Sequence, residues 1–462
     1  MKLQDTLSNL QQELDISKNV KIYLCGVTVY DESHIGHART IIVFDVLRKY
    51  LESKGIEIEF IQNFTDVDDK IINRANAENT TAEEISAKYI ENYFKDFDGL
   101  NVKRATNYPK ATEHIEDIIK FIEKLIEKET AYISKNGVYF SVSKFSEYGK
   151  LSKKKIDELQ SGSRIEIDDS KNNPLDFAVW KLSDIEPTWD SPWGKGRPGW
   201  HIECSAMSIK YLGENFDIHG GGRDLIFPHH ENEIAQSESC TGSQFAKIWM
   251  HVGMVTINGE KMSKSIGNIK SIKHVLENWG SNVIRLFCLS GHYSKPVDYS
   301  EDLLKENLTK WRQVETCYYE LIHANSESHE EINPIIKKIG IEFDNALEDN
   351  FNTHLALSAL FQLSKEGNRL AAEEKLGKKD AQNIKTELKR MLGILGLTIP
   401  EMTENEKQEI DELIANREQF RKEKQFDEAD VIRDKINEMD IEIVDHKGKT
   451  TWMKKEKIQS DK

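Results

Sequence analysis

The sequence predicts an α/β core with a parallel sheet, interrupted by an insertion and followed by a bundle of α-helices and a small C-terminal module. Three observations predict this organisation. Strand and helix patterns alternate in two separate stretches, near residues 21–64 and 216–259. Between them, residues 136–200 are irregular and rich in Pro, Gly and Trp. After about residue 300 the pattern is one of successive amphipathic helices.

The first half of the core has the pattern strand, helix, strand. Residues 21–27 and 56–64 are short apolar runs, and residues 38–55 carry apolar side chains at helical spacing before a glycine. Such a βαβ unit places its strands parallel, with a crevice at their carboxyl ends. Residues 82–130 are predicted to be mostly helical.

The second half repeats this alternation. We expect a strand that runs into a glycine loop over residues 216–227, a helix over 229–240 and a strand over 247–259. The bundle is predicted from four amphipathic segments, 302–325, 331–350, 354–371 and 378–396. A linker over 399–408, a helical pair and a short β-like end complete the chain.

Composition limits the possible functions. The chain has 462 residues, which predicts several domains, and a net charge of −16, which argues against a general nucleic-acid coat protein. No apolar run reaches the ~18–20 residues that span a bilayer, and no signal-peptide core is evident, so we expect a cytoplasmic protein without a membrane partner. Five sparse cysteines indicate reduced thiols rather than a disulfide framework.

Two histidines flank a glycine where the first helix begins, in the segment His34-Ile35-Gly36-His37. A helix N-terminus offers free N–H groups and partial positive charge, which suit a phosphate. The imidazoles add donors, and Gly36 leaves room for a flat base or sugar. Taken alone, four such residues are more often a helix cap beside a surface histidine.

A second motif, Lys261-Met262-Ser263-Lys264-Ser265, follows the last strand of the second half. Lys261 and Lys264 are compact cations that can hold a triphosphate. A lysine-rich loop is common by itself. Two such motifs, each beside a strand end of a two-part α/β core, together indicate a nucleotide site.

With both motifs in place, the sequence resembles the class I aminoacyl-tRNA synthetases. The resemblance implies a Rossmann-type catalytic core that activates an amino acid with ATP and Mg²⁺, by positioning and electrostatic stabilisation. The catalytic residues that it implies are His34, His37, Lys261 and Lys264. The ATP-binding residues that it implies are His34, Gly36, His37, Gly222, Asp224 and Lys264.

Four residues at predicted strand ends or helix starts have the chemistry of a metal site. Cys25 ends the first strand, and Cys204 begins the second half of the core. His229 and Glu233 have the i, i+4 spacing that places two ligands on one helix face. Two thiolates, one imidazole and one carboxylate suit Zn²⁺.

Other interpretations of these residues remain open. A lone buried cysteine such as Cys25 is usually core packing. His230 is an alternative to His229, although its i+4 partner is Ile234. Cys240 is left out of the set because it lies at a polar helix end.

Across nearly its whole length the chain resembles the cysteinyl-tRNA synthetase family. Val27 departs from the family, which usually has proline there. The matching blocks are YLCGVTVYDESHIGHAR, NFTDVDDKI, RPGWHIECSAMS, DIHGGGRDLIFPHHENEIAQSE, KMSKSIGN and EDNFNT.

The resemblance implies one Zn²⁺ per subunit, held by Cys25, Cys204, His229 and Glu233 and bound by the thiolate of the substrate, L-cysteine. Such a site would separate cysteine from serine without an editing domain. Candidate walls of the amino-acid pocket are Gly26, Thr65, Asp66 and Trp200, although Trp200 fits core packing equally well.

The resemblance also implies tRNA(Cys) as a partner, with cysteine transferred to its 3′ end by a monomer. Candidate anticodon contacts are Arg421, Phe426, Asp430 and Asp445, each of which also fits an ordinary surface or packing residue. Lysines 153–155 and the tail 446–457, with an exposed-looking Trp452, are further candidate patches.

These inferences divide the chain into six parts. They are the first half of the catalytic domain (1–104), the connective insertion (105–195), the second half (196–258), the KMSKS loop and stem-contact region (259–310), the helical bundle (311–398) and the anticodon-binding module (399–462).

Two other functions compete with this one. A cysteine ligase that joins activated cysteine to a small amine shares such a core but lacks the C-terminal module. A non-catalytic nucleic-acid-binding protein with a structural zinc is disfavoured, because structural sites use cysteine pairs at short spacing and this chain carries both ATP signatures.

Overall fold

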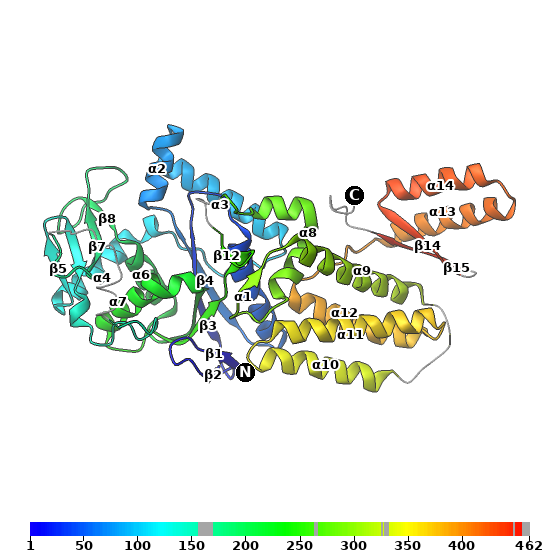
Figure 1. The fold of residues 1–462 in the computed structure, drawn as a ribbon, viewed down its shortest axis with the longest axis horizontal. Coiled ribbons are helices and arrows are strands. Elements are labelled where there is room, and N and C mark those ends of the chain that lie inside the picture. The colour runs from blue at the N-terminus through cyan, green and yellow to red at the C-terminus, as the bar shows by residue number, and fades with distance from the viewer. Residues whose placement is uncertain (156–169, 263–266, 325–326, 328–331, 447–448, 455–462) are drawn as a thin grey trace. The chain divides into compact units, whose positions relative to one another are not determined.

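The computed structural model describes residues 1–155, 170–262, 267–324, 327, 332–446 and 449–454. The chain forms two compact units, whose elements Figure 1 labels. The first unit comprises residues 1–272, 291–298 and 348–351, and the second comprises residues 273–290, 299–347 and 352–462. The six-part division stays a prediction.

A four-stranded parallel sheet is the core of the first unit, with strand order β10-β9-β3-β4. Helices lie on both of its faces: a Cβ at Gly220 would meet Phe44 of α1, whereas one at Gly221 would meet His230 beside α7. The parallel sheet predicted from the two alternating stretches is confirmed. Its strands are β3 (Val20–Thr28), β4 (Ile58–Thr65), β9 (Phe216–Gly222) and β10 (Ala246–Val252).

Helix α1 (Ile35–Ser53) connects β3 to β4 and begins at the histidine motif. It starts three residues before the predicted 38–55, because the His34 side chain caps it by accepting the Gly36 and His37 N–H groups. The mostly helical character of residues 82–130 is confirmed. The helices that follow β4 are α2 (Asp69–Glu78), α3 (Ala82–Gly99), the 3₁₀ turn η1 (Ala111–His114) and α4 (Ile115–Glu127).

The predicted insertion contains an antiparallel sheet in the order β5-β6-β7-β8. Buried Val138, Phe140 and Trp180 belong to one hydrophobic cluster with residues of α4 and α6. The elements are β5 (Ala131–Ser134), β6 (Gly137–Phe140), the turn η2 (Val142–Lys144), β7 (Phe177–Leu182) and β8 (Gly196–Pro198).

The second half of the core differs from the prediction in two places. The helix expected over 229–240 is α7 (Glu231–Thr241), preceded by the turns η3 (Arg223–Leu225) and η4 (Ile226–His230). The strand expected over 247–259 is two strands, β10 and β11, which belong to different sheets. Between them lies Gly253, where a Cβ would be 2.1 Å from the Lys295 carbonyl oxygen. Helix α6 (Trp200–Leu212) precedes β9.

Two small sheets complete the first unit. Strands β12-β11-β13 form one, and the N-terminal hairpin β1-β2 forms the other. Their bounds are β1 (Lys2–Gln4), β2 (Gln11–Glu13), β11 (Val255–Ile257), β12 (Glu260–Lys261) and β13 (Val297–Asp298).

The second unit is helical, as predicted. Helix α8 (Ile272–Leu289) is interrupted at Gly280, whose φ is 72°. The four predicted bundle helices are present as α9 (Glu301–His323), α10 (Asn333–Glu348), α11 (Thr353–Ala372) and α12 (Lys378–Leu395). In the part of the chain that the structure describes, no helix combines the length and apolar character that crossing a membrane requires.

The C-terminal part is a helical pair followed by a hairpin, as predicted: α13 (Glu404–Lys422), α14 (Phe426–Glu438), β14 (Ile441–His446) and β15 (Lys449–Lys454). The linker predicted over 399–408 is shorter, because Thr403 and Glu406 form a capping box that starts α13. The expectation that Trp452 is exposed is wrong. Trp452 is 2% exposed, and its Nε1 donates to Asp411 Oδ1 at 2.8 Å, because its position on β15 faces inward.

Candidate functional site

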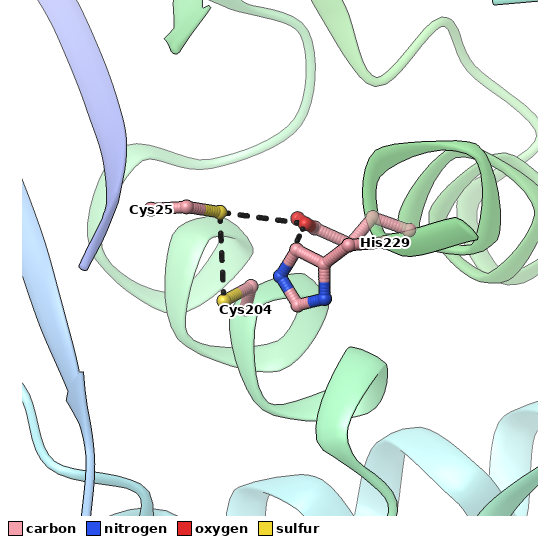
Figure 2. Close-up of side chains that lie close together, drawn as sticks. Cys25, Cys204 and His229 are labelled. Carbon is pink, nitrogen blue, oxygen red and sulfur yellow. Dashed lines mark hydrogen bonds and ion pairs between the residues drawn. The ribbon is translucent and has the colours of Figure 1, made fainter. Parts of the chain in front are cut away.

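A cluster of buried ligand-type side chains lies at the sheet (Figure 2). It comprises Cys25 of β3, Cys204 of α6, His229 of η4 and Glu233 of α7, whose ligand atoms all lie within 4.8 Å of one another. The Cys25 Sγ lies 3.7 Å from the Cys204 Sγ and 3.4 Å from Glu233 Oε1. His229 Nε2 lies 3.1 Å from the same Oε1.

The donor set fits a zinc ion. Tetrahedral Zn²⁺ with bonds of about 2.0–2.3 Å requires ligand atoms roughly 3.3–3.8 Å apart, and the three separations above are close to this range. Two sulfurs, one nitrogen and one oxygen also match zinc's preferred ligands. The four residues that the sequence predicted as ligands are therefore brought together with suitable spacing.

The cluster carries little positive charge of its own. Burial raises the pKa of the Cys25 thiol well above its usual range. At Cys204 the hydrogen bond from Cys25 favours the thiolate, but burial and Glu233 outweigh it and the pKa is again raised. Burial also lowers the pKa of His229. The protein thus supplies little positive charge of its own to stabilise thiolates, which a divalent cation would do.

A second arrangement shares two of these residues. Cys25 and Glu233 also group with His219 and His230 within the same distance limit. His230 Nε2 lies 3.3 Å from the Cys25 Sγ, and His219 Nε2 lies 2.8 Å from Glu233 Oε2. The sequence analysis kept His230 as an alternative on helical spacing alone and missed His219. The sequence places His219 in the strand that runs into the glycine loop, but its spacing from Cys25 and Glu233 does not predict their contact.

The predicted walls of the amino-acid pocket are near this cluster. The Trp200 ring centroid lies 4.3 Å from that of His229. Thr65 donates to Glu203 Oε2 at 3.0 Å, beside Cys204. A Cβ at Gly26 would lie 1.6 Å from the Asn63 carbonyl oxygen, so only glycine fits there.

Asp66 is engaged elsewhere. Its two carboxylate oxygens accept the Thr112 N–H at 3.0 Å and hydroxyl at 2.5 Å. Burial raises its pKa, and the bonds from Thr112 oppose this change. Its contacts explain a structural role in joining η1 to the end of β4.

The histidine motif forms a tight cap. His34 Nδ1 accepts the N–H groups of Gly36 and His37 at 3.1 and 3.4 Å, and the two imidazole centroids are 3.7 Å apart. The cap is therefore present, and the nucleotide interpretation stays a prediction that is compatible with it, because the same imidazoles stand at the positive end of α1.

The two signatures meet in space. A Cβ at Gly36 would lie 3.4 Å from Met262 Cε, although more than two hundred residues separate the two motifs. Lys261 ends β12 and is exposed. Lys264 lies outside the described residues. Gly222 ends β9, where a Cβ would lie 2.5 Å from Asp224 Oδ1 and 3.8 Å from Thr40 Oγ1 of α1.

A second candidate site lies in the C-terminal part. A cavity of about 250 Å³ is lined by Arg417, Arg421, Phe426, Ala429, Asp430, Arg433 and Ile443. Three of the four predicted tRNA contacts are thus together, and Phe426 is 60% exposed. Asp445 lies in β14, but its side chain is outside the described structure. The sequence analysis missed Arg417 and Arg433, which helical spacing from Arg421 and Asp430 could have indicated.

Comparisons with known proteins find matches along nearly the whole chain. Residues 11–309 match the family model for the class I (C) tRNA synthetase catalytic domain, and residues 342–399 match the DALR domain. The cysteine–tRNA ligase of Thermodesulfovibrio yellowstonii is 48% identical over 98% of this chain and 99% of its own length. That of Pyrococcus abyssi is 45% identical over 98% of both chains.

Solved structures show the same fold. Methionyl-tRNA synthetase of Mycobacterium tuberculosis, in complex with methionyl-adenylate, has a TM-score of 0.62 at 15% identity, covering 82% of this chain and 89% of that one. LeuRS of Agrobacterium radiobacter K84, in a ternary complex with tRNA, has a TM-score of 0.61 at 10% identity, covering 83% and 85%.

Proposed function

The chain belongs to the cysteine–tRNA ligases, a family of class I aminoacyl-tRNA synthetases, and from this premise we propose that it charges tRNA(Cys) with a cysteine recognised through Zn²⁺. In the first step a carboxylate oxygen of L-cysteine attacks the α-phosphate of Mg²⁺-bound ATP, giving cysteinyl-adenylate and pyrophosphate. In the second, a 3′-terminal hydroxyl of the tRNA attacks the cysteinyl carbonyl and AMP leaves. We place this activity in the cytoplasm and expect a monomer.

The buried cluster carries the choice of amino acid. Cys25, Cys204, His229 and Glu233 would hold Zn²⁺, with His230 in reach of Cys25 as the alternative imidazole. Bound there, the ion would favour the soft thiolate of cysteine over the hydroxyl of serine. The Trp200 ring against His229 would close one side of the pocket, and Gly26 would let β3 pass close to Asn63 of β4 beside Cys25.

The chemistry of the first step would fall to the two signatures. His34 and His37 stand at the positive end of α1 and would position and stabilise the α-phosphate as its charge develops. Lys261 and Lys264 would neutralise the leaving pyrophosphate. Gly222 and Asp224, at the carboxyl end of β9, would hold the ATP ribose.

The C-terminal part would supply contacts to the polynucleotide. Phe426 offers an exposed ring for base stacking, and the neighbouring Arg421 and Asp430 offer hydrogen-bonding groups for base edges. Asp445 is included on the sequence pattern alone. The acidic chain makes such local cationic patches necessary.

The test is ATP–pyrophosphate exchange against a panel of amino acids, with zinc and after chelation, followed by charging of tRNA(Cys). We expect exchange with cysteine only, loss on chelation and recovery with zinc. Exchange with another amino acid would contradict the substrate. Cysteine exchange without tRNA charging, but with consumption of a small amine, would select the alternative ligase.

A further inference from the structure

A polar cavity of about 410 Å³ lies at the carboxyl end of β10, within the first unit. None of the residues assigned above to ATP, cysteine or zinc lines it. Its lining comes from segments far apart in the sequence and includes Gln4, Thr6, Arg223, His251, Lys295 and Asn350. The function proposed above leaves this cavity without a use.

Two cations border the cavity without carboxylate partners. Arg223 and Lys295 are both exposed, and Arg223 Nη1 donates to the Ser294 carbonyl at 3.0 Å. Among the residues that the structure describes, neither cation forms an ion pair, and no acidic side chain lines the cavity. In a chain with 79 acidic and 63 basic residues, this local excess of positive charge favours an anionic ligand.

Polar side chains line the rest of the cavity. They include Gln4, Thr6, Asn9, His251 and Asn350. Side chains of these types can form hydrogen bonds with the hydroxyl or amino groups of a ligand.

The turn that presents Asn350 is firmly anchored. Asn350 and Phe351 have φ values of 59° and 47°, and the Phe351 side chain is fully buried. His292 Nε2 donates to the Asn350 carbonyl at 3.1 Å, while its Nδ1 accepts the Ser294 N–H at 3.3 Å. Burial lowers the pKa of His292, the hydrogen bond to the Asn350 carbonyl opposes this change, and the nearby Lys295 adds to it.

The lining suits a ligand that carries an anionic group together with further hydrogen-bonding groups. The cavity is much larger than the ~30 Å³ share of a water molecule and lies in the usual range of small-molecule sites. A nucleotide has a phosphate for the cations, and hydroxyl or amino groups for the polar side chains. We propose that this cavity binds a nucleotide unit, with its phosphate at Arg223 and Lys295.

The nucleotide has two possible sources, a residue of bound tRNA or a free nucleotide. The first source rests on the proposed function, and the second does not. Both predict that Lys295→Glu weakens binding, because it places a carboxylate against the phosphate. Lys144→Glu, an exposed lysine of η2 outside the cavity, makes the same charge change and is the matched control.

The experiment measures binding of the full chain to tRNA(Cys) by fluorescence anisotropy across a salt series, and to labelled AMP by equilibrium dialysis. If tRNA is the source, Lys295→Glu raises the Kd for tRNA about tenfold. It also reduces the slope of log Kd against log salt concentration by about one. Lys295→Arg and Lys144→Glu leave both quantities unchanged. If a free nucleotide is the source, AMP binds at two sites per chain and at one in Lys295→Glu.

Either result supports the cavity as a nucleotide site. The proposal is overturned if AMP binds at one site in all variants and Lys295→Glu matches Lys144→Glu in tRNA affinity. Failure of the unmutated chain to exchange pyrophosphate with cysteine would instead reject the proposed function. Because AMP binding is scored without cysteine or tRNA, the two failures are distinguishable.

Discussion

The metal cluster and the arginine-lined cavity of the C-terminal part are built in opposite ways. The cluster takes Cys25, Cys204 and the His229–Glu233 pair from separate elements and holds each side chain at 8% exposure or less. The cavity takes nearly all of its lining from α13 and α14, and its aromatic ring, Phe426, is 60% exposed.

The difference follows from what each site would bind. A metal ion needs ligand atoms fixed to within tenths of an ångström and shielded from water, which only a packed core provides. A flexible polynucleotide is bound by long, solvent-exposed side chains. Their charges attract the phosphates over about 10 Å, and salt screens this attraction. Substitutions in the cluster should therefore remove nearly all zinc binding and activity, whereas substitutions in the cavity should reduce tRNA affinity in small steps.

The largest effect is expected at the thiolate ligands. Cys204→Ser replaces a soft thiolate ligand by a hydroxyl, which binds zinc poorly. Loss of a residue that only hydrogen-bonds to a ligand lowers metal affinity roughly 10–100-fold, and loss of the ligand itself should lower it further. Metal analysis should find little zinc, and cysteine-dependent exchange should fall to background. Cys240→Ser, at a buried cysteine outside the cluster, should keep both.

The histidine motif should give the next effect. His34→Asn retains a good helix-capping residue but removes the imidazole, so stability should hold while exchange slows. Loss of one stabilising donor costs about 10²–10³-fold in rate. Melting temperature and zinc content should match those of the unmutated chain. A lower melting temperature, or unchanged exchange activity, would indicate that the motif only caps the helix.

A substitution at His219 tests whether residues that contact the predicted ligands also contribute to zinc binding. The His219 Nε2 contacts Glu233 Oε2 at 2.8 Å, so His219→Gln should loosen that carboxylate and weaken zinc binding by about 10–100-fold. Competition with a chromophoric chelator measures this change directly. An unchanged zinc affinity would show that Glu233 is held by its other contacts.

The smallest effect is expected in the C-terminal cavity. Phe426→Ala should weaken tRNA(Cys) binding by about 1 kcal/mol, the lower end of what one stacked base contributes, because the ring is largely exposed. Exchange without tRNA should be unchanged. Val431→Ala on the same helix, where Val431 is 69% exposed and lines no part of the cavity, is the control. Equal tRNA affinities in the two variants would argue against stacking on Phe426.

The same contrast explains what the sequence could predict. Helical spacing places His229 and Glu233 on one face, and the two βαβ patterns place Cys25 near the carboxyl edge of a parallel sheet, so these features were predictable. The contact between His219 and Glu233 depends on how β9 and α7 pack, which no local pattern contains.

Burial in the C-terminal hairpin was also hidden from the sequence. Trp452 follows a lysine-rich stretch, which suggested exposure, yet its place in β15 opposite Ile443 turns it inward. Strand register decides such a case, and register is set by the partner strand rather than by neighbours in the chain.

The central claim is that the buried cluster holds a metal ion that binds the thiolate of substrate cysteine. Replacement of zinc by Co²⁺ and titration with cysteine would test it most directly, since each thiolate on cobalt adds a charge-transfer absorption in the near ultraviolet. The account predicts that cysteine increases this absorption by one further thiolate and that serine leaves it unchanged. A spectrum indifferent to cysteine, in a protein that still makes cysteinyl-adenylate, would contradict the claim.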